Sequence, residues 1–266
     1  MIDQKLLDAV SNLVTTVGQY QSQCFRSLST IGGQEKEARE FVSEVDLNSE
    51  EMLITGLQKL LPDAGFYGEE TGIHGNTTLR WVIDPLDGTT NFLSGLDQFS
   101  ISVALEQEEK TSLGIVYRPQ SQESYTALSG RGLYHNGQPW IPAKTDSLKQ
   151  ALIGTGFPYR SQDLSKHFFP CAEEVLYRCR GIRRFGSGAL DLSYVAAGFL
   201  QGFWESDLQP YDVASALLFL EESGQIITNQ RGEQYSPYRD RMMICGSQAV
   251  HEELLKIVAH HYPKDL

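Results

Sequence analysis

The stretch Trp81-Val82-Ile83-Asp84-Pro85-Leu86-Asp87-Gly88-Thr89-Thr90-Asn91-Phe92 combines an apolar run with two carboxylates three positions apart. We interpret residues 81–83 as a buried strand that ends in Asp84. A carboxylate in that position is costly unless it is paired or bound to a cation. Pro85 biases the residue before it towards an extended backbone, and Gly88 lets the backbone approach a ligand closely. The stretch therefore predicts a strand that delivers acidic groups to a site.

Two interpretations of these acidic groups are open. Asp84 and Asp87 on one turn can bridge hard cations such as Mg²⁺. A short helix that begins at Thr89 would direct the free N–H groups of Gly88 and Thr89 towards an anion. The alternative is an ordinary capped turn in which Asp87 is the N-cap of that helix. An EF-hand loop does not fit, because the D-x-D-x-D-G spacing is absent.

Other carboxylates stand at the ends of expected elements. Glu69 and Glu70 follow a strand at 64–67, Glu205 ends a strand at 202–205, and Asp212 stands just before a helix that starts near residue 213. Each has an ordinary explanation, since paired glutamates are commonly solvated and an aspartate before a helix is commonly an N-cap. If they converge with Asp84, they form one metal cluster.

Hydrophobic periodicity predicts the other elements. Helices are expected over 6–17, 45–61, 164–180, 190–199, 213–222 and 252–260, and strands over 79–84, 100–106, 113–117, 124–128, 151–155 and 242–245. Asn136-Gly137 indicates a tight hairpin turn. The mixed order predicts an α+β fold of layered sheets and helices. The 266 residues fit a single domain, with a soft internal division near 142–148.

Charge and hydropathy restrict the partners. The formal net charge of −12 disfavours nucleic acid as the main ligand, because phosphate backbones need a basic face. Phosphate monoesters remain possible if metal ions reverse the local charge. No apolar run reaches the roughly 18 residues of a membrane span. The N-terminus lacks the pattern of a signal peptide, so a cytoplasmic location is expected.

Taken together, the motifs resemble the inositol monophosphatase family in order along nearly the whole chain. The matching segments are Gly68-Glu69-Glu70, Trp81 to Phe92, Thr155-Gly156-Phe157-Pro158-Tyr159-Arg160, Gly186-Ser187-Gly188-Ala189-Leu190-Asp191, Trp204-Glu205 and Pro210-Tyr211-Asp212-Val213-Ala214. The resemblance implies an α-β-α-β-α sandwich, and a magnesium-dependent, lithium-sensitive phosphatase. It also implies two or three Mg²⁺ per site, a homodimer, and inositol monophosphate or a similar small polyol or sugar phosphate as substrate.

The resemblance also implies roles for individual residues. The metal ligands would be the side chains of Glu69, Asp84, Asp87 and Asp212 and the carbonyl of Leu86. Thr89, paired with Asp46 and near Glu69, would position or deprotonate the attacking water. Gly88 and Thr89 would bind phosphate through their N–H groups. Substrate contacts would come from Asp87, Gly186, Ser187, Gly188, Glu205 and Asp212. Lys36 stands close to a family lysine, with plain surface charge as the alternative.

Some positions depart from the family pattern and leave the substrate open. Tyr211 stands where tryptophan is common, Gly188 stands where alanine is common, and residues 94–97 differ from the usual stretch. No departure removes a metal ligand. Fructose 1,6-bisphosphate, histidinol phosphate or a phosphorylated nucleotide are therefore alternative substrates. An alternative from another class is a non-catalytic regulatory or binding protein on the same fold.

Overall fold

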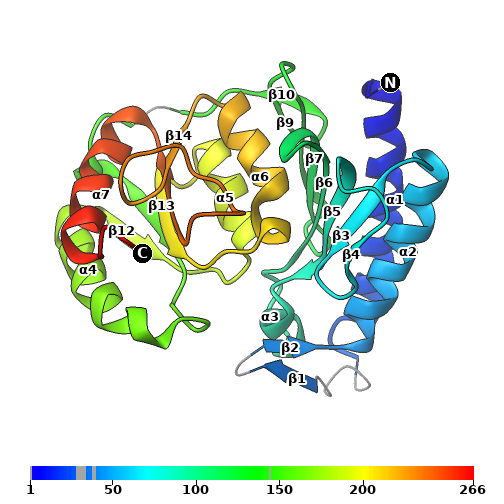
Figure 1. Cartoon of the computed structure of the whole chain (residues 1–266), viewed down its shortest axis with the longest axis horizontal. Coiled ribbons are helices and arrows are strands. Elements are labelled where there is room, and N and C mark those ends of the chain that lie inside the picture. Colours follow the sequence, from blue (N-terminus) through cyan, green and yellow to red (C-terminus); the bar gives the residue numbers. More distant parts are fainter. Residues whose placement is uncertain (1, 28–33, 38–39, 144) are drawn as a thin grey trace.

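The computed structural model describes residues 2–27, 34–37, 40–143 and 145–266, without the side chains of residues 34–42. Two long helices, α1 (Gln4–Cys24) and α2 (Glu44–Leu60), pack side by side (Figure 1). The side chains of Asp3 and Ser43 accept from backbone N–H groups in the first turns and start the two helices. The buried residues of α1 recur every three or four positions, which confirms the predicted amphipathic pattern. They are Leu7, Val10, Val14, Val17, Gly18 and Gln21.

The first large sheet takes its strands from the middle of the chain. They are β3 (Gly65–Gly68), β4 (Gly72–His74), β5 (Leu79–Asp87), β6 (Ser100–Gln107), β7 (Lys110–Arg118), β8 (Glu123–Leu128), β9 (Leu133–His135) and β10 (Gln138–Trp140). Their spatial order is β10-β9-β8-β7-β6-β5-β3-β4, and only β3 and β5 run parallel. A separate two-stranded sheet pairs β1 (Gln34–Glu37) with β2 (Glu40–Val42). The predicted hairpin turn is confirmed, because Asn136 and Gly137 join β9 to β10 with φ angles of 50° and 73°.

The second large sheet comes from the C-terminal part of the chain. Its strands are β11 (Leu152–Thr155), β12 (Gly181–Arg183), β13 (Gly202–Ser206), β14 (Ile226–Thr228) and β15 (Met242–Gly246), in the order β12-β11-β13-β15-β14. β11 runs parallel to both of its neighbours, and the other pairs are antiparallel. The remaining helices are α3 (Thr89–Leu93), α4 (Ser165–Arg178), α5 (Gly188–Ala197), α6 (Pro210–Glu222) and α7 (Gln248–His261), with short 3₁₀ turns η2 (Leu148–Gln150) and η3 (Gln162–Leu164).

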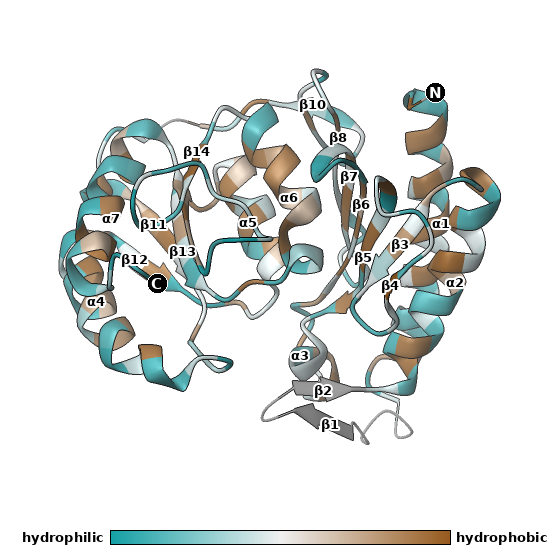
Figure 2. Ribbon diagram, viewed as in Figure 1, coloured by the Kyte–Doolittle hydropathy of each residue, from teal (hydrophilic) through white to brown (hydrophobic). Residues whose placement is uncertain are grey.

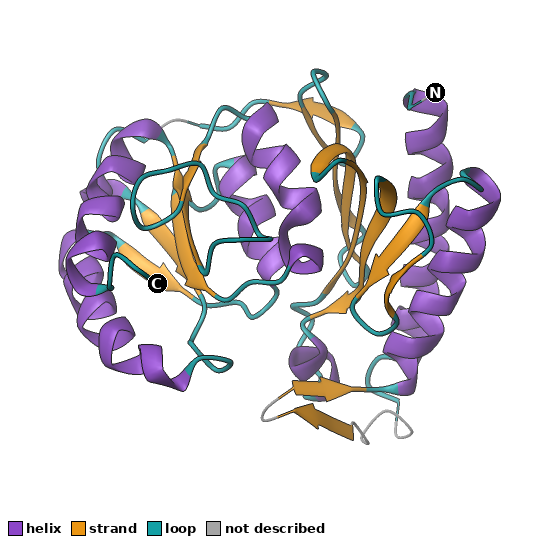
Figure 3. Ribbon diagram, in the orientation of Figure 1, coloured by secondary structure: helices purple, strands orange, loops and turns teal. Residues whose placement is uncertain are grey.

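These elements form five layers. Helices α1 and α2 cover the outer face of the first sheet, α5 and α6 lie between the two sheets, and α4 and α7 cover the outer face of the second sheet (Figures 1 and 3). The fold is therefore the predicted layered α+β type. In Figure 2 the first sheet and α6 carry many hydrophobic residues, whereas the outer helices α4 and α7 show hydrophilic surface. No helix within the described ranges has both the length and the hydropathy to cross a bilayer.

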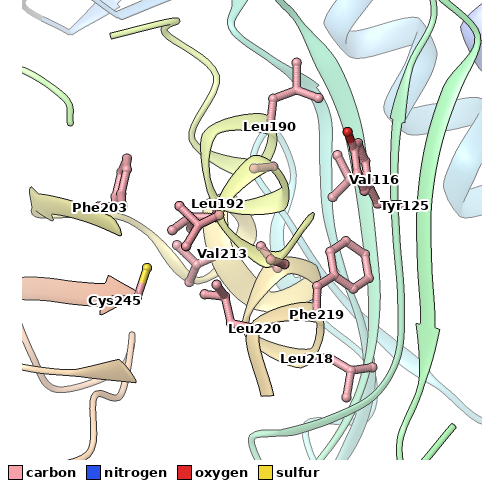
Figure 4. Packing of buried hydrophobic residues seen from close by; sticks show 14 of the residues in the cluster. Val116, Tyr125, Leu190, Leu192, Phe203, Val213, Leu218, Phe219, Leu220 and Cys245 are labelled. Atoms are coloured by element: carbon pink, nitrogen blue, oxygen red, sulfur yellow. The ribbon is translucent and has the colours of Figure 1, made fainter. Parts of the chain in front are cut away.

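The central helices are buried on nearly all sides. Eight of the ten residues of α5 are buried, from Ala189 to Ala197. A helix that is apolar all round must lie inside a protein. One hydrophobic cluster accordingly joins Val116 and Tyr125 of the first sheet, Leu192 of α5, Phe219 of α6 and Phe203 of the second sheet (Figure 4). This cluster packs α5 and α6 between the two sheets.

The structure corrects several boundaries. Strand β5 does not end at Asp84 but continues to Asp87, with an irregular register between these residues opposite β6. Five short strands were not predicted, namely β1, β2, β4, β12 and β14, and each has only three or four residues. The proposed soft division near 142–148 falls between β10 and β11, in the connection between the two large sheets.

Candidate functional site

A cleft of about 370 Å³ opens where the end of β5 meets the start of α5, the end of β13 and the start of α6. Most of the sequence-predicted site residues line it. These are Glu69, Asp84, Leu86, Asp87, Gly88, Thr89, Gly186, Ser187, Gly188, Glu205 and Asp212. Asp46 does not line the cleft but contacts Thr89 from behind. The side chain of Lys36 lies outside the described residues.

Three carboxylates from two elements converge in this cleft. Asp84 and Asp87 come from β5 and Asp212 comes from α6, and one oxygen of each lies within 4.8 Å of the others. Burial raises the pKa of Asp84 well above its usual value, and the charges of Glu69, Asp87 and Asp212 raise it further. So much negative charge in a small buried volume is stabilised by a cation, and carboxylate oxygens are the ligands that hard divalent cations prefer. The residues therefore fit a metal centre.

The irregular end of β5 brings its two aspartates to the same side. Pro85 has no N–H group to continue the ladder with β6, and the register shifts between Asp84 and Asp87. The side chain of Gln21, from α1, donates to the Pro85 carbonyl at 2.7 Å. Asp84 accepts from the backbone N–H of Leu86 at 3.0 Å. These contacts close a tight turn and fix its carboxylates.

Asp87 is held by the start of α5. Its oxygens accept from the Ser187 hydroxyl at 2.5 Å and from the N–H groups of Gly188 and Ala189 at 3.2 and 2.8 Å. Burial and the charge of Asp212 raise its pKa to about 6, while these three hydrogen bonds lower it. The capped-turn alternative is thus wrong, because α3 has Gly88 as its N-cap and no side-chain capping bond. Asp87 instead caps a helix from the other half of the chain.

Asp212 lies inside α6 and not before it. The helix begins at Pro210, whose fixed φ suits the first helical position. Asp212 is therefore its third residue, and its carboxylate accepts from the backbone N–H of Gln209 at 2.7 Å. Arg160 forms an ion pair with the same carboxylate at 3.2 Å. The helix start thus directs Asp212 towards the end of β5.

Glu69 follows β3 and adjoins the cluster. Its backbone N–H donates to the Ile83 carbonyl at 3.1 Å, which continues the pairing of β3 with β5. Its carboxyl group hydrogen-bonds to that of Asp84 and contributes to the raised pKa of Asp84. Glu69 lines the cleft and is only partly exposed. The alternative of a solvated glutamate pair therefore does not hold for Glu69.

Thr89 and Asp46 form the expected pair. The Thr89 hydroxyl lies 2.8 Å from Oδ1 of Asp46 and 3.0 Å from the Leu86 carbonyl oxygen. Asp46 is fully buried in the first turn of α2, and burial raises its pKa, while its hydrogen bonds with Ser43 and Thr89 lower it. Because a hydroxyl has one hydrogen, donation to either acceptor leaves the Thr89 oxygen lone pairs available towards the cleft.

Gly88 permits the backbone turn between β5 and α3. Its φ of 96° is in the left-handed region, and a Cβ there would lie 2.8 Å from the Gln98 carbonyl oxygen. Any other residue would be strained and would collide with backbone. The following helix α3 begins at Thr89, so its first N–H groups, which have no intrahelical acceptor, start beside the cleft.

The opposite wall carries Glu205, at the end of β13. Burial raises its pKa to about 8, with further contributions from the charges of Asp191 and Asp212, while Arg184 and Arg160 lower it. A Cβ at Gly156 would lie 1.8 Å from Oε1 of Glu205, so the carboxyl group packs directly on this glycine. At neutral pH such a carboxyl group is largely protonated and can both donate and accept hydrogen bonds.

Other cleft residues had no predicted role. Arg160 and Asp191 lie in segments that the sequence motifs include, and Arg184 lies two residues before one of them, but no local pattern distinguished these residues from surface charge. Asp191 is 2% exposed, and burial followed by the charge of Asp87 raises its pKa. Arg184 lies over the Tyr159 ring, 5.4 Å from its centroid. Only the tertiary structure assembles these side chains at the cleft.

Comparison with known proteins shows the family to which the chain belongs. Residues 3–262 match the inositol monophosphatase family. An inositol-1-monophosphatase of Mesorhizobium japonicum is 34% identical, with 97% of each chain covered. The Nus factor SuhB of Pseudomonas aeruginosa is 33% identical, with 99% of each chain covered. Among solved structures, the extragenic suppressor protein suhB of Bartonella henselae superposes with a TM-score of 0.91 at 31% identity, covering 96% of this chain and 98% of that one.

Proposed function

The chain belongs to the inositol monophosphatase family and is a phosphoric monoester hydrolase; from this premise we propose that it hydrolyses inositol monophosphate, or a similar small polyol or sugar phosphate, with Mg²⁺ as cofactor. The observation that carries the proposal is the convergence of Asp84, Asp87 and Asp212 in one cleft, with an oxygen of each within 4.8 Å of the others. A cluster of this kind suits hard cations together with a phosphate group.

The family is metal-dependent, and we assign the metal ligands from this cluster. Asp84, Asp87 and Asp212 would hold the metal, with Glu69 beside Asp84 and the carbonyl of Leu86 completing the set. Two or three Mg²⁺ are proposed per site. When bound, the metal would lower the pKa of a water molecule and neutralise charge on the phosphate.

Thr89 is proposed to position the attacking water. The Thr89 hydroxyl can donate its hydrogen to the buried Asp46 carboxylate 2.8 Å away, so that the Thr89 oxygen can accept a hydrogen bond from the water. Glu69, on the same side of the cleft, is the proposed partner for the second water proton. Because the transition state of phosphoryl transfer is loose, orientation of the water matters more than the strength of a base.

The start of α3 is proposed to bind the phosphate group. The backbone N–H groups of Gly88 and Thr89 lie beside the cleft, next to the two aspartates of β5. Free N–H groups at a helix start suit an anion. The wall opposite would then contact the polyol through Glu205, Ser187 and the glycines at 186 and 188, with Asp87 and Asp212 at the boundary.

Further properties are proposed on family grounds. We expect inhibition by lithium, a homodimer and a cytoplasmic location. The role of Lys36 near the site stays a prediction. Because substrate contacts depend on the wall that carries Glu205, where the sequence departs from the family pattern at Gly188, fructose 1,6-bisphosphate, histidinol phosphate and nucleotides are competing substrates.

The test is release of inorganic phosphate from a substrate panel, with and without Mg²⁺ and lithium. The panel contains myo-inositol 1-phosphate, fructose 1,6-bisphosphate, histidinol phosphate and a nucleoside monophosphate. We expect the highest kcat/KM on the inositol or a related polyol ester, only with Mg²⁺. The control compares Asp84→Asn with Asp63→Asn, since Asp63 is an exposed carboxylate. Hydrolysis that persists in excess chelator would refute the metal assignment. Substrate binding without turnover would favour the alternative of a non-catalytic binding protein.

A further inference from the structure

Glu50 is a buried carboxylate one turn after Asp46 on the face of α2 that packs towards the first sheet. It is 1% exposed and does not line the cleft. Its two oxygens accept from the backbone N–H groups of Glu70 at 3.0 Å and Thr71 at 2.8 Å. A buried charge is costly, and hydrogen bonds to an ionised acceptor are the strong kind. Its position therefore restricts the backbone directly after Glu69.

Gly68 lets this carboxylate come close to the chain. A Cβ at Gly68 would lie 2.5–2.7 Å from the three carboxyl atoms of Glu50. Glu50 thus rests on the last residue of β3 and binds the two residues after Glu69. Glu69 itself is fixed to β5 by the 3.1 Å hydrogen bond from its N–H group to the Ile83 carbonyl. The backbone is therefore held before, at and after Glu69.

We propose that Glu50 is a positioning residue that orients the Glu69 carboxylate towards Asp84 and thereby sets the affinity of the site for Mg²⁺. The inference rests on the proposed function, in which Glu69 is a metal ligand. The Glu69 segment has glycines on both sides, at 68 and 72, which leaves its backbone with many alternative conformations. The charge-assisted bonds from Glu50 select one of them.

The same face of α2 already supports a second group of the site. Asp46 bonds to the Thr89 hydroxyl after β5, and Glu50 bonds to the backbone after β3. The parallel strands β3 and β5 lie side by side, and the last residue of β3, Gly68, is paired with Ile83 of β5. One helix turn thus carries two buried carboxylates, one for each strand end. This spacing explains how α2 keeps the proposed water-positioning group and the proposed ligand Glu69 in a fixed relation.

The primary variant is Glu50→Gln, which keeps the length and shape of the side chain. The amide oxygen still accepts from one N–H group, but the amide nitrogen then faces the other N–H group, donor against donor. Glu51→Gln is the matched control, because Glu51 is exposed on the same helix. Hydrogen–deuterium exchange in chelator should show faster exchange at residues 70 and 71 in Glu50→Gln only. Unchanged exchange at these two amides would overturn the proposal that Glu50 holds the backbone after Glu69.

Calorimetric titration of the metal-free proteins with Mg²⁺ gives the second readout. Removal of groups that orient metal ligands typically weakens metal binding about 10- to 100-fold, and we expect a loss in this range for Glu50→Gln. Gly68→Ala should give the same loss, because its Cβ displaces the Glu50 carboxylate without removing charge. A lower Tm with an unchanged Mg²⁺ dissociation constant would mean a purely structural role and overturn the inference.

A double-mutant cycle separates this inference from the proposed function. If Glu50 acts through Glu69, the effect of Glu50→Gln on Mg²⁺ affinity disappears in a Glu69→Gln background. Additive losses would show that Glu50 acts elsewhere and overturn the inference alone. A Glu69→Gln protein that binds Mg²⁺ as the parent does would remove Glu69 from the ligand set, and the inference would fail together with that part of the proposed function.

Discussion

Glu205→Gln should stabilise the metal-free protein at alkaline pH. The side chain is half-buried in the cleft, and burial with the charges of Asp191 and Asp212 raises its pKa to about 8. Glutamine has the same shape and carries no charge. The substitution therefore removes the unfavourable ionisation and leaves the packing against Gly156 in place.

The sign follows from proton linkage. The pKa of Glu205 is higher in the folded state, at about 8, than the ordinary 4.5 of the unfolded chain. The folded state therefore binds more protons between pH 4.5 and 8, and the free energy of unfolding falls as pH rises through this interval. Each pH unit in this interval lowers the free energy of unfolding by about 1.4 kcal/mol. The total loss above pH 8 is therefore at most about 5 kcal/mol. Since Glu205 keeps some contact with solvent, we expect Glu205→Gln to raise the free energy of unfolding above pH 8 by about 2–3 kcal/mol.

Urea unfolding in excess chelator at pH 4.5, 6, 7.5 and 9 measures this difference. We expect Glu205→Gln and the parent to match at pH 4.5 and to diverge progressively up to pH 9. Glu173→Gln, at an exposed glutamate of α4, is the control and should follow the parent throughout. With Mg²⁺ restored, the variant should change relative kcat/KM among substrates and keep its Mg²⁺ requirement. A pH-independent difference between variant and parent would refute the electrostatic argument.

Three other substitutions test separate parts of the structure. Asp84→Asn should lower kcat/KM by at least about 100-fold through lost metal binding, which calorimetry with Mg²⁺ checks independently; near-parental turnover would contradict the cluster. Arg80→Met should lower the free energy of unfolding by about 3–5 kcal/mol, because it leaves the buried Glu106 carboxylate, 3.2 Å from Arg80, without its cation. Adding Glu106→Gln to this variant should recover much of the lost free energy of unfolding, as measured by urea unfolding. Gly88→Ala should lower the free energy of unfolding by about 1–2 kcal/mol because of the left-handed backbone alone, and the contact of the new Cβ with the Gln98 carbonyl oxygen should lower it further. If the turn is displaced, KM for phosphate esters should rise.

The long elements were predictable because their patterns are local. α1 and α2 repeat apolar residues at helical spacing, and β6 and β7 are long enough for an apolar strand pattern to stand out. The strands β4, β12 and β14 have three residues each and form only as additions to longer neighbours. Too few residues alternate there to give a periodic signal. The end of β5 was placed too early because Pro85 indicates a break, whereas pairing with β6 resumes at Asp87.

The site was predictable in its residue types and less so in its contacts. Carboxylates at the ends of strands and helices indicated that such groups could converge, and the resemblance to the family implied that Glu69, Asp84, Asp87 and Asp212 are the ligands. Their supporting contacts join residues far apart in the sequence, and no local pattern encodes them. Gln21 binds the carbonyl of residue 85, and Glu50 binds the amides of residues 70 and 71. The partner of Asp87 at Ser187 lies 100 residues later.

The contacts of Asp87 indicate that metal binding and the packing of the two sheets depend on each other. Asp87 belongs to the first sheet, yet it accepts hydrogen bonds from Ser187, Gly188 and Ala189 at the start of α5. Asn91, in α3, similarly donates to the Phe185 carbonyl at 2.8 Å. The third carboxylate, Asp212, comes from α6, so the cluster exists only when α5 and α6 are docked on the first sheet. A cation that binds the docked state alone stabilises it by mass action, about 2.7 kcal/mol at 100 times its dissociation constant. The same cation would offset the charge repulsion that, after burial, raises the pKa of Asp84, so metal binding would stabilise the docked sheets and the site together.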